Sequence, residues 1–280
     1  MMAQVAPRVG DIKFNTRLVL GAMQRAEDAH CDMLVLPELV LTGYPPEDLL
    51  LRHAFMREVD EAVAQIVANA RQAVVVFGHP RLVDGDLFNS ATLAANGKLV
   101  GVYDKRALPN YGVFDELRYF TAGSGADVFE VHGWRIGVGI CEDLWDDELA
   151  ESVASRPRDV LLNLNASPFH LDKQLEREAL MQRRAVRFGV PAVYVNPVGG
   201  AGRDRVRWWQ SCHGCEWRVA GAGTNVRMCR CAGGCSCELW RGNTNAGYNE
   251  SDTLRAGARS TRLCAAQRLF AGANRPVRGH

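Results

Sequence analysis

Short hydrophobic runs alternate with amphipathic stretches along the first 200 residues of the chain. Runs of about four to eight apolar residues are typical of buried strands, whereas apolar residues three to four positions apart indicate helices. By the first rule we predict strands at Met33–Leu36, Ala73–Phe77, Trp134–Ile140, Val160–Leu164 and Pro191–Asn196. By the second rule we predict helices at Asn15–His30, Arg57–Arg71 and Lys173–Phe188.

A hairpin is predicted after the second of these strands. The run Leu87–Ala95 is followed by Asn96-Gly97, a dipeptide that favours tight hairpin turns, and then by Lys98–Tyr103. Strands that alternate with helices, together with some adjacent strands, indicate a layered α/β fold. At 280 residues the chain has ample length to bury a core.

The composition changes sharply near residue 200. Residues 1–200 contain 20 Lys and Arg against 27 Asp and Glu, a net charge of −7. Residues 201–280 contain 13 Arg, no Lys and 5 acidic residues, a net charge of +8, and they hold 7 of the 9 cysteines. The overall charge of +1 hides this difference, so we treat 1–200 and 201–280 as separate regions.

The composition of the whole chain is that of a soluble globular protein. Hydrophobic residues make up 47% and charged residues 23%. No apolar run approaches the roughly 18 residues that a membrane span needs, and the N-terminus lacks a charged segment followed by an apolar one. We therefore predict a cytoplasmic enzyme that does not bind a membrane.

Three polar residues stand where predicted strands end. Glu38 follows the run Met-Leu-Val-Leu-Pro, Lys105 follows the second arm of the hairpin, and Cys141 follows Trp134–Ile140. Taken singly, such a cysteine is usually a small buried hydrophobe, and such a lysine or glutamate is usually a surface charge. Together they supply a nucleophile, a base to activate it and a cation to stabilise an oxyanion, without a histidine.

These residues and their neighbours resemble a known family. Leu36-Pro37-Glu38-Leu39, Lys105 with Leu108-Pro109-Asn110-Tyr111, and Gly139-Ile140-Cys141-Glu142-Asp143 are similar to the Glu-Lys-Cys triad of the nitrilase, or carbon–nitrogen hydrolase, superfamily. The longer runs at 36–50, 108–120 and 165–170 resemble the glutaminase domain of bacterial glutamine-dependent NAD synthetases. The resemblance covers residues 3–200 almost continuously.

The resemblance implies a four-layer αββα sandwich and acyl transfer through a thioester. Glu38 would be the general base that deprotonates Cys141, and later the acid that protonates departing ammonia. Lys105, with the backbone N–H after Cys141, would stabilise the oxyanion, and Glu116 would position Lys105. Three further residues match the positions of the glutamine pocket more loosely: Tyr111, Trp145 and Ser167.

The same resemblance implies the substrate and the partners. Glutamine would be hydrolysed without metal or cofactor, and the ammonia would pass to a synthetase domain that amidates deamido-NAD with ATP and magnesium. Assembly into a homo-oligomer is also implied, and no nucleic acid is expected as a partner. The alternative is a stand-alone amidase of the same superfamily that acts on another small amide.

The cysteine-rich tail at 201–280 has three interpretations. Cys212-His213-Gly214-Cys215, Cys229-Arg230-Cys231 and Cys235-Ser236-Cys237 could be metal ligands, and the arginine excess could bind nucleic acid. However, a zinc ribbon has two Cys-x₂-Cys units, and this tail has only one. No helical or strand period surrounds the cysteines either. The third interpretation is an error of reading frame, which we favour.

A single-base shift turns the tail into family-like sequence. If Val206 is encoded by GTT and Arg207-Trp208-Trp209-Gln210 by CGA TGG TGG CAG, the shifted frame reads TTC GAT GGT GGC, which is Phe-Asp-Gly-Gly. Over Ala201–Arg218, synonymous codons permit QDEIVFDGGSHAMDASGE, which continues the glutaminase domain. In the same frame Leu263–His280 can encode a string ending IGLSGGI, similar to the Ser-Gly-Gly loop that binds ATP pyrophosphate in the synthetase domain.

We therefore predict a carbon–nitrogen hydrolase domain at 1–200 that is incomplete at its C-terminal end. Residues 201–280 are predicted to be a frameshifted, non-native tail without a packed core, because periodic apolar positions are few there. Such a chain would lack the last strands of the sandwich and the synthetase domain, and it would be inactive if those strands are needed. The protein read in the shifted frame from residue 201 onward is called the frame-corrected protein below.

Overall fold

The structure is a computed structural model, and it describes residues 1–198 apart from 113, 126, 155 and 168–172. Beyond residue 198 it describes the strands at 208–212, 215–219, 225–226 and 239–240. The chain divides into two units, Met1–Gly242 and Asn243–His280, and all described residues lie in the first.

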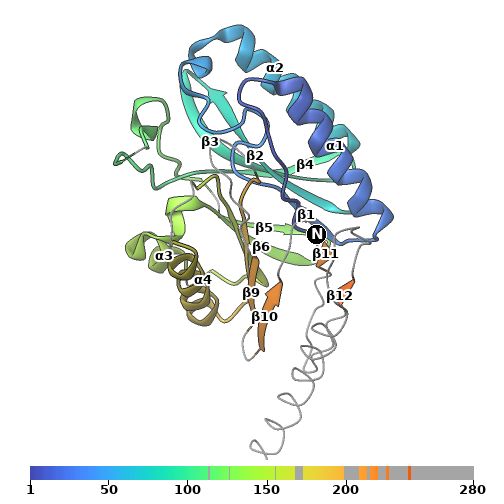
Figure 1. Cartoon of the computed structure of the whole chain (residues 1–280), viewed down its shortest axis with the longest axis vertical. Coiled ribbons are helices and arrows are strands. Elements are labelled where there is room, and N and C mark those ends of the chain that lie inside the picture. The colour runs from blue at the N-terminus through green and yellow to red at the C-terminus, as the bar shows by residue number, and fades with distance from the viewer. Residues whose placement is uncertain are drawn as a thin grey trace, which may run out of the picture. The chain divides into compact units, whose positions relative to one another are not determined.

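The first sheet has four strands, β1 (Met33–Val35), β2 (Val74–Val83), β3 (Asp86–Ala95) and β4 (Lys98–Asp104), in that order. β1 runs parallel to β2, and the other pairs are antiparallel. The long β2–β3–β4 meander therefore carries the end of β4 back to the region where β1 ends (Figure 1).

The second sheet has six strands in the order β10-β9-β8-β7-β6-β5. Its centre is parallel, because β6 pairs with β7 and β7 with β8 in the same direction. β5 and β9 flank this centre as antiparallel neighbours. The bounds are β5 (Val128–Val131), β6 (Trp134–Ile140), β7 (Val160–Leu164), β8 (Ala192–Val195), β9 (Trp208–Cys212) and β10 (Cys215–Val219). A separate pair joins β11 (Asn225–Val226) to β12 (Leu239–Trp240).

Four α-helices and three short 3₁₀ helices complete the described part of the chain. The α-helices are α1 (Ile12–Asp28), α2 (His53–Asn69), α3 (Asp147–Ala154) and α4 (Lys173–Phe188). The 3₁₀ helices are η1 (Glu47–Leu51), η2 (Glu116–Arg118) and η3 (Cys141–Leu144). α1 begins at Ile12 because the carboxylate of Asp11 accepts the Phe14 N–H and so caps the helix.

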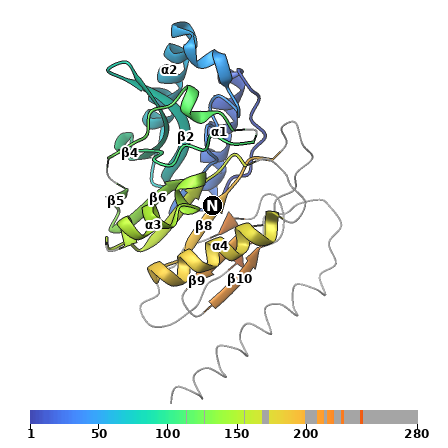
Figure 2. The same ribbon diagram turned by 90° about the vertical axis from the view of Figure 1, so that its left-hand side faces the viewer.

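Alternate residues of the strands face different cores, which defines the layers. Leu34 and Val75 belong to the cluster that packs under α1 and α2, whereas Met33 and Val74 belong to the cluster between the two sheets. On the second sheet, Leu161 packs under α4. The result is a helix layer, two sheets and a second helix layer (Figure 2), so the predicted four-layer αββα sandwich is confirmed.

The predicted elements are present, with differences at several ends. The bounds of β6, β7 and α4 are those predicted. β2 continues to Val83, beyond the Phe77 predicted from hydrophobicity, although Pro80 cannot donate a ladder hydrogen bond. Because β1 pairs with β2 only as far as Val76, the segment around Pro80 has β3 as its one described sheet neighbour, and the missing donor is tolerated.

Several elements were not predicted. β5 and α3 are too short for a period to stand out from its surroundings. β9 and β10 lie beyond residue 200, where the hydrophobic pattern predicted no strand, and they extend the second sheet. Two predictions stay untested: the boundary at residue 200 and the absence of a packed core in 201–280. The residues that would test them lie almost entirely outside the described part of the chain.

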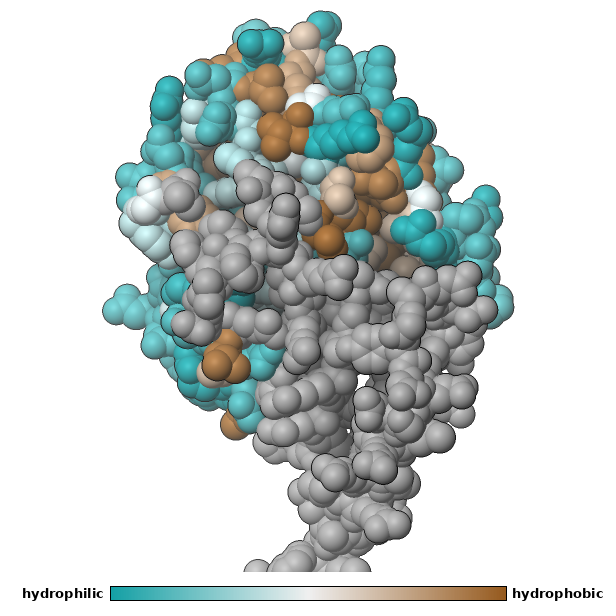
Figure 3. All heavy atoms as spheres, viewed as in Figure 1, coloured by the Kyte–Doolittle hydropathy of each residue, from teal (hydrophilic) through white to brown (hydrophobic). Residues whose placement is uncertain are grey.

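The surface of the described part is mostly hydrophilic on the face drawn in Figure 3, with smaller hydrophobic areas. The exposed large apolar side chains come from separate segments of the chain: Val9, Leu51, Leu82, Leu99, Tyr111, Leu117, Leu175 and Val186. Within the described ranges, no helix is both long enough and apolar enough to cross a membrane.

Candidate active site

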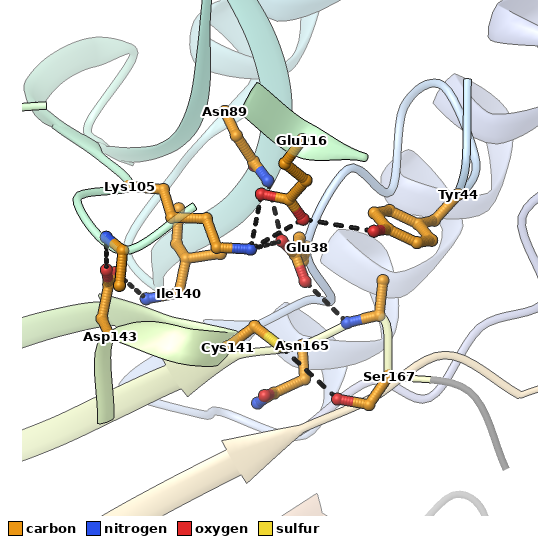
Figure 4. Close-up of polar contacts among 12 residues, drawn as sticks. Glu38, Tyr44, Asn89, Lys105, Glu116, Ile140, Cys141, Asp143, Asn165 and Ser167 are labelled. Atoms are coloured by element: carbon orange, nitrogen blue, oxygen red, sulfur yellow. Dashed lines mark hydrogen bonds and ion pairs between the residues drawn. The ribbon is translucent and has the colours of Figure 1, made fainter. Parts of the chain in front are cut away.

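Three buried polar side chains meet where strands of the two sheets end. Glu38 follows β1 and Lys105 follows β4 in the first sheet, while Cys141 follows β6 in the second (Figure 4). All three are buried, and Lys105 is completely excluded from solvent. The ends of rigid strands hold these groups in place while the loops that follow leave room for a substrate.

The Glu38 carboxylate accepts three hydrogen bonds. Its Oε1 accepts from Asn89 Nδ2 at 2.7 Å and from Lys105 Nζ at 2.9 Å, and its Oε2 accepts from the Ala166 N–H at 2.8 Å. The backbone N–H of Glu38 donates to the Asn165 carbonyl at 3.3 Å. An ionised carboxylate accepts and does not donate, so this set of donors suits the charged form that a general base requires.

The backbone of Glu38 lies directly on a glycine of β2. A Cβ placed on Gly78 would lie 2.4 Å from the Leu39 nitrogen, 2.6 Å from Glu38 Cα and 2.7 Å from the Pro37 oxygen. These are rigid backbone atoms, so a side chain at position 78 would push the Glu38 loop away from the sheet. Glycine is therefore required here by close approach.

Gly78→Ala is expected to destabilise the chain by about 1–3 kcal/mol and to lower activity at least about tenfold, because overpacking displaces the carboxylate. Urea denaturation and steady-state amide hydrolysis measure the two effects. Gly125→Ala is the matched control, since a Cβ at Gly125 meets nothing within 4 Å. Equal activity of the two variants would show that the position of Glu38 does not depend on this contact.

Lys105 lies between two carboxylates. Its Nζ is 2.9 Å from Glu38 Oε1 and 2.8 Å from Glu116 Oε2. Burial by itself lowers the pKa of Lys105, but the nearby carboxylates, above all that of Glu38, outweigh it and hold the pKa well above its usual value. Lys105 therefore stays cationic, as an oxyanion stabiliser must.

Cys141 begins η3 in a left-handed conformation. Its φ of 45° is uncommon for a residue with a side chain, and it places the thiol at a sharp strand-to-helix turn. Burial raises the pKa of the thiol to about 12, with the Glu38 carboxylate adding to the effect and Lys105 opposing it. The resting thiol is therefore protonated, and it needs a base at the moment of attack.

Ser167 lies beside the thiol and is itself held in place. Its Oγ is 3.5 Å from Cys141 Sγ. Asn196 accepts the Ser167 N–H at 2.8 Å and donates to the Ser167 carbonyl at 3.1 Å, while the hydroxyl of Tyr194 donates to Ser167 Oγ at 3.4 Å. The end of β8 thus fixes Ser167 against the nucleophile.

A carboxylate and aromatic rings lie next to this centre. The Tyr111 hydroxyl donates to Glu142 Oε1 at 3.0 Å, and Glu142 immediately follows Cys141. The ring of Phe114 lies between Tyr111 and Tyr44, with centroid separations of 5.8 and 6.4 Å. Burial and the hydrogen bond to Glu142 raise the pKa of Tyr111 to about 12, so its hydroxyl remains a donor.

Comparison with known proteins places this arrangement in a family. The sequence model of the carbon–nitrogen hydrolase family matches residues 2–216, more than three quarters of the chain. The chain belongs to the carbon–nitrogen hydrolase family.

The relatives of this carbon–nitrogen hydrolase include much longer proteins. Glutamine-dependent NAD(+) synthetases of Thermotoga maritima and Xylella fastidiosa are 39% and 41% identical over 203 residues, which is 71% of this chain but 35% and 37% of theirs. The solved structure of the Acinetobacter baumannii synthetase with ADP is 33% identical, with a TM-score of 0.72 over 79% of this chain and 43% of its own. The chain thus spans little more than a third of the curated relatives.

A nitrilase-superfamily amidase from Nesterenkonia shares the fold as well. Its structure has a TM-score of 0.66 and covers 78% of this chain and 85% of the amidase, at 23% sequence identity. At that identity the likeness concerns the fold alone. Both comparisons agree with the layered architecture of this carbon–nitrogen hydrolase.

Most residues singled out from the sequence of this carbon–nitrogen hydrolase come together. Glu38, Lys105 and Glu116 form one ion-paired group, and Ser167 lies against Cys141. Trp145 differs: it packs against the core under α4, with Lys173 Nζ 5.3 Å from the centre of its ring. Among the described contacts none joins Trp145 to Cys141, so its role in a glutamine pocket stays a prediction.

Three residues of the site were not singled out from the sequence. Asn89 binds Glu38, Tyr44 donates to Glu116 Oε1 at 3.2 Å, and Asp143 accepts backbone N–H groups next to Lys105 and Cys141. Asn89 is one of four polar residues in β3, with Asp86, Ser90 and Thr92, so no pattern in that strand marked it. Tyr44 and Asp143 lie within segments that resemble the family, at 36–50 and 139–143, but no spacing rule identified their partners.

No group of three or more His, Cys, Asp or Glu side chains in the described ranges is arranged to hold a metal ion. The cysteines of the predicted metal-binding alternative lie in the tail, where no side chain is described. The described site brings a carboxylate, an ammonium group and a thiol together at neighbouring strand ends, a set of groups that suits nucleophilic acyl transfer.

Stability should depend on pH through Glu116. Burial, together with the charge of Glu38, raises the pKa of Glu116 from 4.5 to about 7, although Lys105 opposes the shift. The folded state then binds this proton more tightly than the unfolded state, so its contribution to stability is complete below pH 4.5 and is lost as pH rises to about 7. Glu116→Gln should abolish this dependence.

The measurement is the free energy of unfolding of wild type and Glu116→Gln by urea across that pH range. We expect the difference, wild type minus variant, to fall as pH rises and to level off above pH 7. His79 contributes in the opposite sense, because burial lowers its pKa to about 4, but it is common to both proteins and cancels in the difference. A difference that does not change with pH would contradict the shift.

Proposed function

We propose that this chain hydrolyses the side-chain amide of glutamine through a thioester at Cys141. The observation that carries the proposal is the buried group formed by Glu38, Lys105 and Glu116 beside a protonated thiol. This group supplies base, oxyanion donor and nucleophile in one place.

In the first half of the reaction the thiol is acylated. Glu38 takes the proton of Cys141 as Sγ attacks the amide carbon, and the carbonyl oxygen becomes an oxyanion stabilised by the Lys105 ammonium. The carbon–nitrogen bond then breaks while Glu38 gives the proton to nitrogen. Ammonia leaves and a glutamyl thioester remains.

In the second half water replaces ammonia. Glu38 takes a proton from water as the oxygen attacks the thioester carbon, and Lys105 again stabilises the oxyanion. The carbon–sulfur bond breaks, glutamate leaves, and the proton returns to Sγ. One carboxylate can act in both halves because Asn89, Lys105 and Ala166 hold it in a fixed orientation.

The surroundings of the nucleophile favour glutamine over a simple neutral amide. Glu142 immediately follows Cys141 in the chain, and its carboxylate accepts a hydrogen bond from the Tyr111 hydroxyl. Such a charge suits the ammonium group of glutamine, whereas acetamide offers nothing to pair with it. Ser167, next to the thiol, is a further hydrogen-bonding group for the substrate.

We also propose that the gene encodes a longer enzyme. Several relatives are named glutamine-dependent NAD(+) synthetases, and this chain spans little more than a third of them. The shifted reading frame of residues 201–280 can encode family-like sequence, and this supports a frame-corrected protein in which ammonia passes to a synthetase domain. That domain would use ATP and magnesium to amidate deamido-NAD, and the glutaminase step would need no cofactor. A cytoplasmic homo-oligomer is the corresponding assembly.

Ammonia release from a panel of amides tests the activity. We expect the frame-corrected protein to hydrolyse glutamine much faster than acetamide or propionamide, because the carboxylate of Glu142 can pair with an ammonium group that those two amides lack. Faster turnover of acetamide would favour the stand-alone amidase. The 280-residue chain, assayed in parallel, shows whether the strands after residue 200 are needed.

Sequencing of the DNA around codons 199–202 tests the reading frame. We expect one inserted or deleted base relative to an open frame that encodes the QDEIVFDGGS run. Confirmation of the 280-residue frame, together with stoichiometric zinc in the purified chain, would instead favour the metal-binding tail.

A further inference from the structure

Asp143 joins the two halves of the site. It is the third residue of η3, two positions after Cys141, and it is buried. Its carboxylate faces away from the thiol and toward the loop that follows Lys105 (Figure 4). Asp143 plays no part in the acyl transfer described above, so its burial needs another explanation.

Four donors converge on this carboxylate from three segments. Oδ1 accepts the backbone N–H groups of Arg106 at 3.0 Å and Ala107 at 2.8 Å. Oδ2 accepts the Ile140 N–H at 2.7 Å and the Tyr103 hydroxyl at 2.8 Å. Each oxygen therefore accepts two hydrogen bonds. Burial raises the pKa of Asp143, but these hydrogen bonds oppose the shift and favour the carboxylate form.

The two oxygens hold different catalytic groups. Oδ1 fixes the two residues that immediately follow Lys105, and Oδ2 fixes the residue that immediately precedes Cys141. The Ile140 N–H donates to the side chain of the third residue of η3, and this bond holds the turn in which Cys141 has a φ of 45°. One side chain thus fixes the Lys105 loop of the first sheet against the Cys141 turn of the second.

We propose that Asp143 is a positioning residue that sets the placement of the Lys105 ammonium relative to the Cys141 thiol. It acts through Lys105 and Cys141 and does not touch the substrate. The inference rests on the proposed function, since it assumes that these two groups react together. An error of about 1 Å in their separation is enough to cost a large factor in rate.

Asp143→Asn is the sharpest test. An amide has a single acceptor oxygen, so its NH₂ group must face either the Arg106 and Ala107 N–H groups or the Ile140 N–H and Tyr103 hydroxyl. One of the two attachments is then lost while the shape is kept. We expect kcat for glutamine to fall at least about tenfold with KM within about threefold, because the ground-state complex is little changed.

A readout that does not require turnover is the rate at which iodoacetamide alkylates Cys141, followed by mass spectrometry of the peptide that contains it. Lys105 favours the thiolate, so Asp143→Asn should slow alkylation about tenfold in the wild-type background. In a Lys105→Met background, Asp143→Asn should change the alkylation rate less than about twofold, because the ammonium group that Asp143 positions is gone. Equal losses in both backgrounds, or none in either, would overturn the proposal.

Two further variants keep the test decisive. Tyr103→Phe removes one donor and leaves the carboxylate, so it should show the same pattern with a smaller loss, about threefold, even if Asp143→Asn fails to fold. Asp159→Asn is the matched control: Asp159 accepts the Arg135 N–H at 2.8 Å at the opposite end of β6, and its replacement should leave alkylation unchanged. If wild type hydrolyses no glutamine, the proposed function fails while the alkylation cycle still tests Asp143.

Discussion

Replacing Cys141 by alanine is expected to abolish glutamine-dependent NAD synthesis by the frame-corrected protein while leaving ammonia-dependent synthesis intact. The thioester can form only on this thiol, and free ammonia bypasses that step. The side chain is small and buried, so the fold should be retained. The measurement is NAD formation from deamido-NAD with glutamine or with ammonium chloride as the nitrogen source.

Cys31→Ala is the control for this experiment. Cys31 and Cys141 are both buried free thiols of the described part of the chain, but Cys31 belongs to the core under α1 and α2. Its replacement should leave the ratio of glutamine-dependent to ammonia-dependent synthesis unchanged. Glutamine-dependent turnover by Cys141→Ala would show that Cys141 is not the nucleophile.

Lys105→Arg is expected to keep the fold and to lose roughly two or more decades of kcat, in line with the loss of an oxyanion donor. The ammonium contacts Glu38 and Glu116 in a site with no solvent exposure, where a wider planar guanidinium cannot occupy the same position. The effect should appear in kcat more than in KM, because the contact with the oxyanion forms mainly in the transition state.

Steady-state glutamine hydrolysis and circular dichroism measure this prediction. Lys98→Arg is the matched control, since Lys98 is an exposed residue at the start of β4, the strand that leads to Lys105. Near-normal kcat in folded Lys105→Arg would show that the ammonium does not stabilise the oxyanion.

The fold was predictable where both faces of a strand are buried. β6 and β7 are mostly apolar, apart from Arg135 and Asn163, because one face packs between the sheets and the other lies under helices. Their bounds were predicted correctly. The end of β2 was not predictable in this way. Gly78 stands there because the Glu38 backbone approaches closely, and Pro80 is tolerated because β3 is its one described sheet neighbour.

The site was predictable only as far as single residues mark strand ends. Glu38, Lys105 and Cys141 could be found because each follows a strand and because the family motif relates them. Asn89 and Asp143 could not, since their partners lie 51 and 37 residues away in the chain and the contacts depend on tertiary packing. Charge and spacing along the sequence do not specify such long-range hydrogen bonds.

Covalent labelling shows directly whether Cys141 is the nucleophile. The frame-corrected protein is incubated with a glutamine analogue that carries a diazoketone in place of the amide, and the digested protein is mapped by mass spectrometry. If Cys141 is the nucleophile, the peptide that contains it should gain the mass of one analogue minus N₂. Excess glutamine should protect it, and Cys141→Ala should not be labelled. Labelling of another residue, or no label in a protein that still hydrolyses glutamine, would contradict that role of Cys141.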